Sequence, residues 1–260
     1  MFRKGTKVSL SKGRMSKRLL IFLGAGLLIT CGLETYTYLY PISTDTVSSE
    51  TILGYYQFTH NTDNDLDEFQ GYEIFYKLYT PDSAEILNDR SSLEKAYLAA
   101  ESHITGKGRN FSRLRLKKES DNTVLEERPL LRISSGQRGT AWKFKIDFSP
   151  LLKTPKEAPI LIWYQPDGTT EVARFTLLRK SRIEAKAEET FLPDQFLGTD
   201  PDVNEMKVKT IVQTRGKLAV VFAVAAFGRK LDTTPIYSNI IFLNRSPTST
   251  DDVLTIDLSQ

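Results

Sequence analysis

Side chains suited to nucleophilic and acid–base chemistry are scarce in this chain of 260 residues, which has one cysteine, Cys31, and two histidines, His60 and His103. A serine or cysteine nucleophile needs a base within hydrogen-bond reach, and no G-x-S-x-G elbow or other nucleophile motif marks a partner for either histidine. His103 is expected near a helix C-terminus, where a cation is favoured beside the free carbonyls. The sequence therefore predicts a protein that is not an enzyme, with no catalytic residue and no cofactor.

Metal binding is the next chemistry that the residue types allow. Zinc needs three or four Cys, His or carboxylate ligands at short spacing, and the sequence lacks that arrangement. Oxygen-rich runs suit calcium, and the alternating Asp63, Asp65 and Asp67 are the calcium candidates, with a similar run over 200–205. Neither run matches an EF-hand, since the sixth position of the first is Glu68 instead of Gly. A solvated acidic loop between strands is the favoured interpretation.

Aromatic residues in strand-like segments are candidates for a carbohydrate or peptide groove. They are Tyr55, Tyr56, Tyr72, Phe75, Tyr76, Tyr79, Trp142, Trp163 and Tyr164. Alternation along a strand predicts that most of them fill a sandwich core, whereas Phe75 and Tyr79, on the face opposite Tyr76, are predicted to form an exposed patch. A cell-wall or glycan hydrolase is the alternative function, because the 32 Asp and Glu residues leave room for a carboxylate pair that one sequence does not identify.

The N-terminal segment is cationic and then apolar. Seven Lys and Arg residues precede Leu19, no acidic residue occurs before Cys31, and residues 19–30 form an apolar run. This run is shorter than the roughly 20 residues that a membrane-spanning helix needs and matches the apolar core of a secretory signal peptide. The start is either Met1 or Met15. Removal of residues 1–30 leaves 28 Lys and Arg against 32 Asp and Glu, a mixed surface with no electrostatic footprint for nucleic acid.

The residues around the cysteine have a recognisable order, Leu28-Ile29-Thr30-Cys31-Gly32. This order resembles the lipobox of bacterial lipoproteins, although Thr30 stands where that family usually has Gly, Ala or Ser. The resemblance implies cleavage before Cys31 and a thioether-linked lipid on its sulfur, with palmitate among the acyl chains. Two or three acyl chains give stable anchoring. An uncleaved N-terminal anchor helix and a cleaved soluble protein are the alternatives.

The remaining chain is predicted to be β-rich. Residues 31–49 are expected to be a tether, with the folded part beginning near Thr51 and an irregular tail over 246–260. Strands are predicted over 69–79, 142–148, 160–164, 171–178, 218–227 and 236–243, with a Pro-Asp-Gly turn at 166–168. One helix is predicted from a capping box at Ser91 and Glu94. Arg113, Arg115, Lys117 and Lys118 are predicted to line the solvent-facing side of another strand.

Two separated segments resemble parts of a fibronectin type III domain. Phe69-Gln-Gly-Tyr-Glu-Ile-Phe-Tyr-Lys is similar to the third strand of that family, and Val221–Gly228 followed by Ile236–Leu243 is similar to its last two strands. The resemblance implies an all-β, immunoglobulin-like sandwich over 50–245. The two segments lie farther apart than one such domain of about 100 residues allows, so an insertion over about 80–204, carrying the short helix, is expected. Two successive β domains are the competing arrangement.

These features together predict a non-catalytic binding or assembly module, lipid-anchored in a bacterial cell envelope and facing the periplasm or the cell surface. The expected partners are the membrane and, through the folded part, envelope proteins or cell-wall glycan, with no nucleic acid. A structural subunit held in an envelope complex by an uncleaved anchor helix is a further alternative. The ligand, the membrane that holds the anchor and the oligomeric state stay open.

Overall fold

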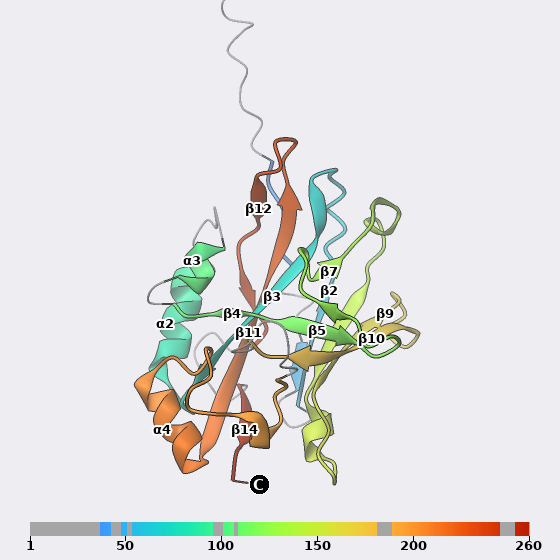
Figure 1. Cartoon of the computed structure of the whole chain (residues 1–260). Helices are drawn as coiled ribbons and strands as arrows, with labels where there is room; N and C mark the ends of the chain where they lie inside the picture. Colours follow the sequence, from blue (N-terminus) through green and yellow to red (C-terminus); the bar gives the residue numbers. More distant parts are fainter. Residues whose placement is uncertain are drawn as a thin grey trace, which may run out of the picture. The chain divides into compact units, whose positions relative to one another are not determined.

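The computed structural model describes residues 37–42, 48–50, 54–95, 101–106, 109–180, 189–244 and 253–259. The chain divides into two units between Thr37 and Tyr38, and the fold described below is that of the second unit. It is mostly β, with two antiparallel sheets, one of them curled into a half-barrel, and three short α-helices (Figure 1). The prediction of a β-rich fold is therefore confirmed in its coarse form.

The first sheet, sheet A, is the curled one. In spatial order its strands are β1 (Ser48–Glu50), β2 (Tyr55–Thr59), β8 (Lys143–Asp147), β9 (Ile160–Tyr164), β10 (Glu171–Leu178), β5 (Arg115–Lys118) and β6 (Val124–Leu125). The predicted turn at 166–168 joins β9 to β10, where Gly168 has a φ of 74° and the Gln165 N–H donates to the Thr170 carbonyl. The strands predicted around 142–148, 160–164 and 171–178 are confirmed.

The second sheet, sheet B, is built on two long strands, β3 (Phe69–Tyr79) and β11 (Lys217–Arg229), which pair along nearly their whole length. β11 also pairs with β12 (Pro235–Tyr237), β13 (Ile241–Phe242) and β14 (Leu254–Asp257). The free side of β3 pairs with β4 (Ser112–Arg113) and β7 (Leu131–Arg132). At Gly71 β7 passes so close that a Cβ would collide with the Leu131 carbonyl, and the φ of 149° at Gly71 also favours glycine.

The main core lies between the two sheets. Period-two geometry sends Tyr72, Ile74, Tyr76 and Leu78 of β3 into it, as predicted, and Phe144 with Ile146 of β8 meets them from sheet A. The chain over 112–118 crosses from sheet B to sheet A, so β4 and β5 connect the two sheets at one side. Leu114 and Leu116 are buried there. This connection closes one side of the space between the two sheets.

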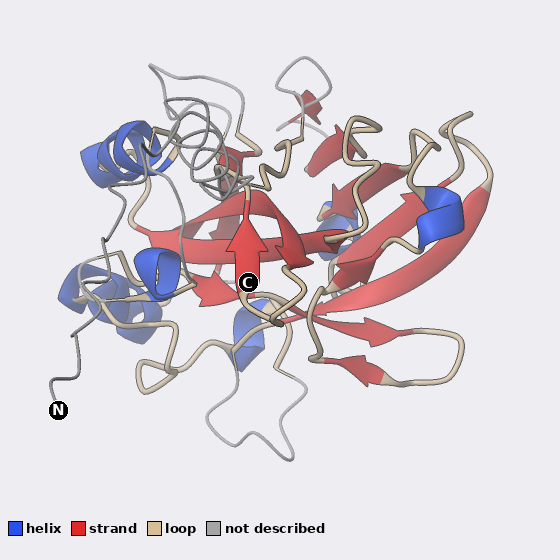
Figure 2. Cartoon of the chain, turned by 90° about the horizontal axis from the view of Figure 1, so that it is seen from above, coloured by secondary structure: helices blue, strands red, loops and turns tan. Residues whose placement is uncertain are grey.

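The other face of sheet B is covered by helices, which lie on the left of Figure 1; Figure 2 gives the view from above, with all helical segments in blue. The covering helices are α2 (Ala84–Leu93) and α3 (Ser102–Thr105), whereas α4 (Met206–Thr214) buries Val208 and Val212 in the main core. Phe75 and Tyr79 are fully buried in the apolar cluster formed with α2 and α3. The prediction of an exposed patch at these two residues is therefore wrong. Lys77 forms ion pairs with Asp89 of α2 and Glu205 before α4, both at 2.9 Å.

The predicted helix start at Ser91 is wrong. Helix α2 begins after Ser83, whose hydroxyl accepts from the Glu85 N–H at 3.3 Å, as an N-cap residue does. Ser91 lies inside α2, where its hydroxyl donates to the Asn88 carbonyl, and Glu94 is the C-cap residue. The serine–glutamate spacing of a capping box therefore falls at the end of a helix instead of its beginning.

Three other boundaries differ from the sequence-based expectations. The strand expected over 236–243 is two short strands, β12 and β13, separated where Ser238 bonds back to Ala226 of β11. Residues 254–257, expected in an irregular tail, form β14. Leu39 and Ile42, expected in a tether, are buried in the main core. Within the described residues, no helix has the length and apolar character needed to cross a membrane.

Candidate functional site

Cys31, the predicted lipidation residue, lies outside the described residues. The calcium candidates Asp63, Asp65 and Asp67 are exposed on the loop between β2 and β3, and Asp67 pairs with Arg138 at 3.2 Å. Asn64, between them, is buried and exchanges hydrogen bonds with the backbone of Tyr40. No group of three His, Cys, Asp or Glu side chains in the described ranges is placed to hold a metal ion.

The second acidic run, over 200–205, forms ion pairs with a buried arginine. Arg179 follows β10, is fully buried, and donates to Asp202 at 2.7 and 3.0 Å and to Asp200 at 3.0 Å. Tyr76 donates to the same carboxylate of Asp202 at 2.6 Å, and the Arg179 guanidinium stacks on the Phe196 ring. Burial opposes the charge of Arg179, yet Asp202 raises its pKa overall, so the guanidinium stays charged. We call this group the Arg179 cluster; it fastens the chain over 189–203 to both sheets.

His60 has a structural environment. It is buried after β2, its Nε2 lies 2.7 Å from the Arg138 carbonyl, and its Nδ1 lies 2.7 Å from the Tyr72 hydroxyl. A carbonyl only accepts, so Nε2 carries the proton and Tyr72 donates to Nδ1. Burial lowers the pKa of His60, which favours this neutral form. Both ring nitrogens are thereby used within the fold, whereas His103 is exposed on α3.

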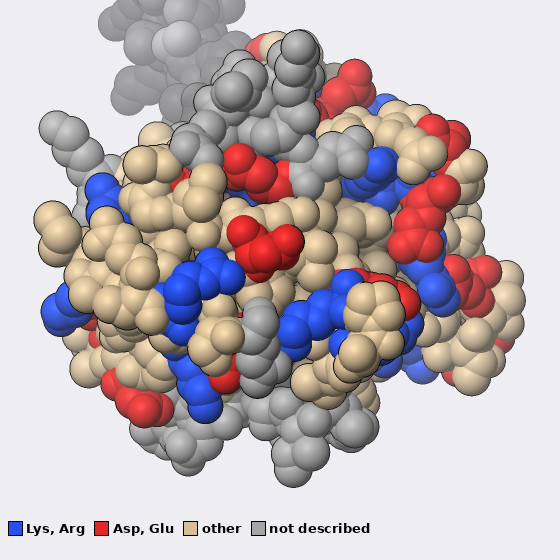
Figure 3. All heavy atoms as spheres, turned by 60° about the horizontal axis from the view of Figure 1, so that its bottom comes forward, with Lys and Arg blue, Asp and Glu red and all other residues tan. Residues whose placement is uncertain are grey.

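The basic run over 113–118 forms strands β4 and β5, as predicted, but its charges are partly neutralised by acids. Arg113 pairs with Glu73, whose side chain is almost fully buried on β3, and Arg115 pairs with Glu126. Acidic and basic side chains are likewise interspersed on the face that Figure 3 shows. The charged groups therefore do not assemble a single-sign patch on that face.

An apolar hollow lies between β6, β9 and β10 of sheet A and the chain over 129–132. We call it the β6 cleft, because β6 forms one wall; its volume is about 590 Å³. Its apolar walls are Val124, Leu125, Pro129, Leu130, Leu131, Trp163, Val172, Ala173 and Phe175. A volume of this size, with apolar walls and few polar groups, is typical of sites for small molecules or apolar side chains. The register of β9, β10, β5 and β6 explains the cleft, since Trp163 lies opposite Ala173 and Leu125 lies opposite Leu116.

Trp163 lines the β6 cleft, and its indole carries a buried polar atom. Its Nε1 is buried and has no hydrogen-bond partner among the described residues. The Trp163 ring is held by an edge contact with Trp142, at a centroid distance of 5.7 Å, and by Phe144 at 5.3 Å. Trp142, by contrast, donates its own Nε1–H to the Gln137 carbonyl at 2.9 Å. An unpaired buried donor costs about 1–3 kcal/mol, so Trp163 offers a hydrogen bond that the fold does not use.

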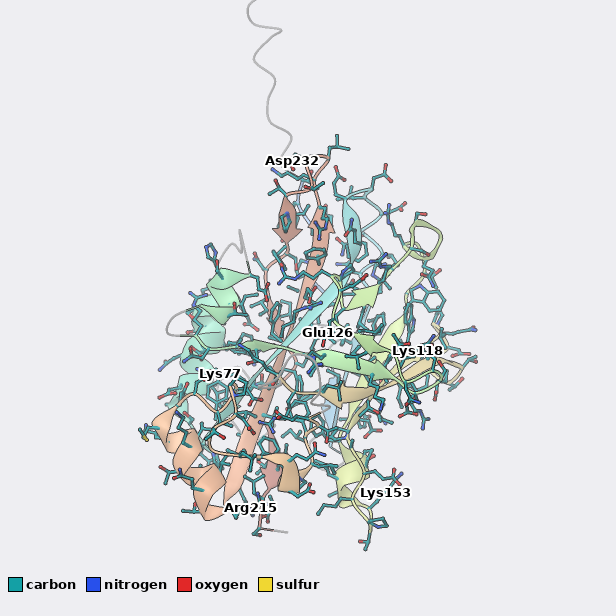
Figure 4. All side chains as sticks on the ribbon, viewed as in Figure 1. Lys77, Lys118, Glu126, Lys153, Arg215 and Asp232 are labelled. Carbon is teal, nitrogen blue, oxygen red and sulfur yellow. The ribbon has the colours of Figure 1, made fainter. Side chains whose placement is uncertain are left out.

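Charged side chains lie around the rim of the β6 cleft. Lys118 and Arg132 line it together with Glu126 and Glu127, so the rim carries both signs. Figure 4 labels Lys118 and Glu126 beside β5, on the half of the molecule that holds sheet A. Val172, which is 45% exposed, lies on the wall of the cleft. The walls can take an apolar group, and the rim gives no preference for one sign of charge.

Sequence reasoning included Trp163 among nine aromatic residues but did not separate it from those that fill the core. No local pattern distinguishes Trp142 from Trp163. Whether the indole N–H has a partner depends on whether a backbone carbonyl from 135–140 reaches it. The basic run over 113–118 is easier to recognise in the sequence as a candidate binding surface, but its arginines form ion pairs with acidic residues of the fold. Comparison with protein-family models, curated proteins and solved structures gave no match for this chain.

Proposed function

We propose that this protein is a lipid-anchored component of a bacterial cell envelope whose folded part is a non-catalytic binding module. The leader supports the anchor, since a cationic segment, a short apolar run and a single cysteine follow one another. The β6 cleft supports the binding role and carries the proposal. It combines an apolar hollow with the buried, unpaired indole N–H of Trp163.

The ligand class follows from the walls of the cleft. Its occupant has an apolar body that covers Val172, Ala173 and Phe175, and one oxygen acceptor that reaches the Trp163 N–H. An acyl chain with a carbonyl group meets both requirements, and so does an apolar peptide segment. We take the acyl compound as the working ligand, because an envelope protein is surrounded by lipid.

The fibronectin type III-like arrangement is part of the same proposal. The pairing of β3 with β11, and of β11 with β12 and β13, supports it, because the segments that resemble the third and the last two strands of that family are neighbours in sheet B. Sandwich domains of this kind often serve as binding modules, although the fold alone does not establish that role.

Binding is tested with cis-parinaric acid, a fluorescent fatty acid, titrated into the purified protein while energy transfer from tryptophan is followed. We expect saturable binding and a loss of about tenfold in affinity for Val172→Asp, because the carboxylate meets the apolar ligand. Leu152→Asp is the matched control: Leu152 is 75% exposed and lies outside the cleft. Absence of saturable binding, or equal affinities of the two variants, would contradict the binding role.

The anchor is tested separately by metabolic labelling with an alkyne-tagged palmitate in cells that express the wild type or Cys31→Ala. We expect label on the wild type alone, since the thioether needs the Cys31 sulfur. Equal labelling of both proteins would show that Cys31 does not carry the lipid.

A further inference from the structure

One end of the second unit carries exposed apolar and aromatic side chains. Leu231, at the tip of the β11–β12 hairpin, is 101% exposed, and Tyr38 and Tyr40 are 46% and 42% exposed. The tip is an ordered turn, in which the Lys230 N–H donates to the Thr234 carbonyl and the Thr233 N–H donates to the Lys230 carbonyl. The apolar side chain of Leu231 is therefore removed from water only when another surface covers the hairpin tip.

Tyr38, Tyr40 and the hairpin lie at the same end. A Cβ on Gly228 would lie 3.2 Å from Cδ1 of Leu39, so the 38–40 segment packs against the end of strand β11, directly before the hairpin tip. The next residue of β11, Arg229, donates its N–H to the Glu68 carbonyl, which belongs to the loop that also holds Tyr40 through Asn64. Tyr38 and Tyr40 contact each other edge to face at 5.3 Å. We call Tyr38, Tyr40 and the hairpin tip over 229–234 the N-terminal end.

The length of chain before this end limits what can cover it. Tyr38 is the seventh residue after Cys31, and a fully extended chain of seven residues spans at most about 25 Å. A lipid on Cys31 therefore holds Tyr38 within that distance of the bilayer surface. A tether also raises the local concentration of the nearby surface to the millimolar range, so a weak contact is enough to be populated.

We infer that the N-terminal end rests on the bilayer that holds the anchor, with Leu231 inserted among the acyl chains and Tyr38 and Tyr40 at headgroup depth. Tyrosine favours this depth because its ring is apolar and its hydroxyl is polar. Arg229 and Lys230 precede Leu231 and reach phosphate groups, while Asp232, Asp63 and Asp65 at the same end repel anionic lipid. The contact is therefore driven by apolar insertion and does not require an anionic membrane. This inference rests on the proposed lipid anchor.

Depth-dependent quenching tests the inference with the acylated full-length chain in phosphatidylcholine vesicles. Leu231→Cys carries an environment-sensitive NBD label, and the vesicles contain a lipid with a nitroxide on its acyl chain. Leu152→Cys is the matched control, because Leu152 is also an exposed leucine and its neighbour Lys153 lies at the end opposite Asp232 (Figure 4). The introduced thiol is the single labelling site when Cys31 carries the lipid, since the chain has no other cysteine.

We expect the label at 231 to be quenched several-fold more strongly than the label at 152, and to the same extent in neutral and anionic vesicles. Equal, weak quenching at the two positions overturns the inference. Shielding of position 231 in native membranes but not in pure lipid also overturns it and identifies a protein as the occupant. Mass spectrometry of the peptide that contains Cys31 tests the anchor independently. A free or NBD-labelled Cys31 thiol refutes the proposed lipidation, whatever the quenching shows.

Discussion

Two buried nitrogen groups, one on β9 and one directly after the neighbouring strand β10, differ in how the fold uses them. The guanidinium of Arg179, at the end of β10, donates to two aspartates and to the Gln195 carbonyl. The indole N–H of Trp163, on β9, has no partner in the described part of the chain, although it is also buried. Hydrogen-bonding groups in the first region hold loops to the sheets. The second region leaves the Trp163 N–H unused beside an apolar hollow, and this contrast is the reason why we propose a stabilising role for the first region and a binding role for the second.

Removal of the cation from the Arg179 cluster gives the largest expected effect. Arg179→Met leaves Asp200 and Asp202 buried without their counter-charge, which is expected to lower the free energy of unfolding by about 3–5 kcal/mol. Urea unfolding followed by circular dichroism measures the loss. Arg174→Met is the control, because the exposed Arg174–Glu171 pair contributes at most about 1 kcal/mol. Similar stabilities of the two variants would remove the stabilising role that we assign to the Arg179 cluster.

The two tryptophans allow a sharper form of the comparison. Trp142→Phe loses the hydrogen bond to the Gln137 carbonyl, whereas Trp163→Phe removes a donor that has no partner. Both variants lose similar ring area, so Trp142→Phe is expected to be less stable than Trp163→Phe by about 1 kcal/mol. Affinity for the fatty-acid probe is expected to fall more for Trp163→Phe. The opposite order in either measurement would contradict the distinction.

The smallest expected effect concerns pH. Burial lowers the pKa of His60 in the folded state, whereas the unfolded imidazole takes up its proton near pH 6.5. The unfolded chain thus binds more protons below about pH 6.5, and this residue makes stability fall as the pH drops. His60→Gln is expected to be less stable at pH 7.5 but to lose less further stability between pH 7.5 and 5.5. An unchanged pH slope in urea titrations would show that His60 does not titrate on unfolding.

Period-two alternation predicted the sheets well, because a strand between two layers shows its burial in its own sequence. β3 and β8 follow this alternation, whereas the nearly continuous apolar run over 218–227 predicts β11 as a strand buried on both faces. The alternation failed for Phe75 and Tyr79, since a strand with polar Glu73 and Lys77 on its second face looks solvent-exposed although helices cover that face. Glu73 and Lys77 are buried there through ion pairs with residues distant in sequence, which no local pattern encodes.

Helix boundaries and the candidate site were less predictable. The capping pattern at Ser91 was mistaken for a start because Ser83, the residue that caps α2, lacks a Glu or Gln three residues later. The β6 cleft depends on the register of four strands and on the path of the chain over 129–132, which the sequence does not specify. The lipidation of Cys31 depends on residues outside the described part of the chain, and it stays a prediction from the leader sequence.

The most direct test of the central claim is the position of the two indole N–H signals in a ¹H–¹⁵N NMR spectrum of the protein, recorded with and without the fatty-acid probe. Addition of the probe is expected to move the Trp163 signal downfield, as its N–H gains an oxygen acceptor, and to leave the Trp142 signal nearly unchanged. Two unshifted signals at saturating probe, or a downfield shift of Trp142 alone, would contradict the assignment of the β6 cleft as the binding site.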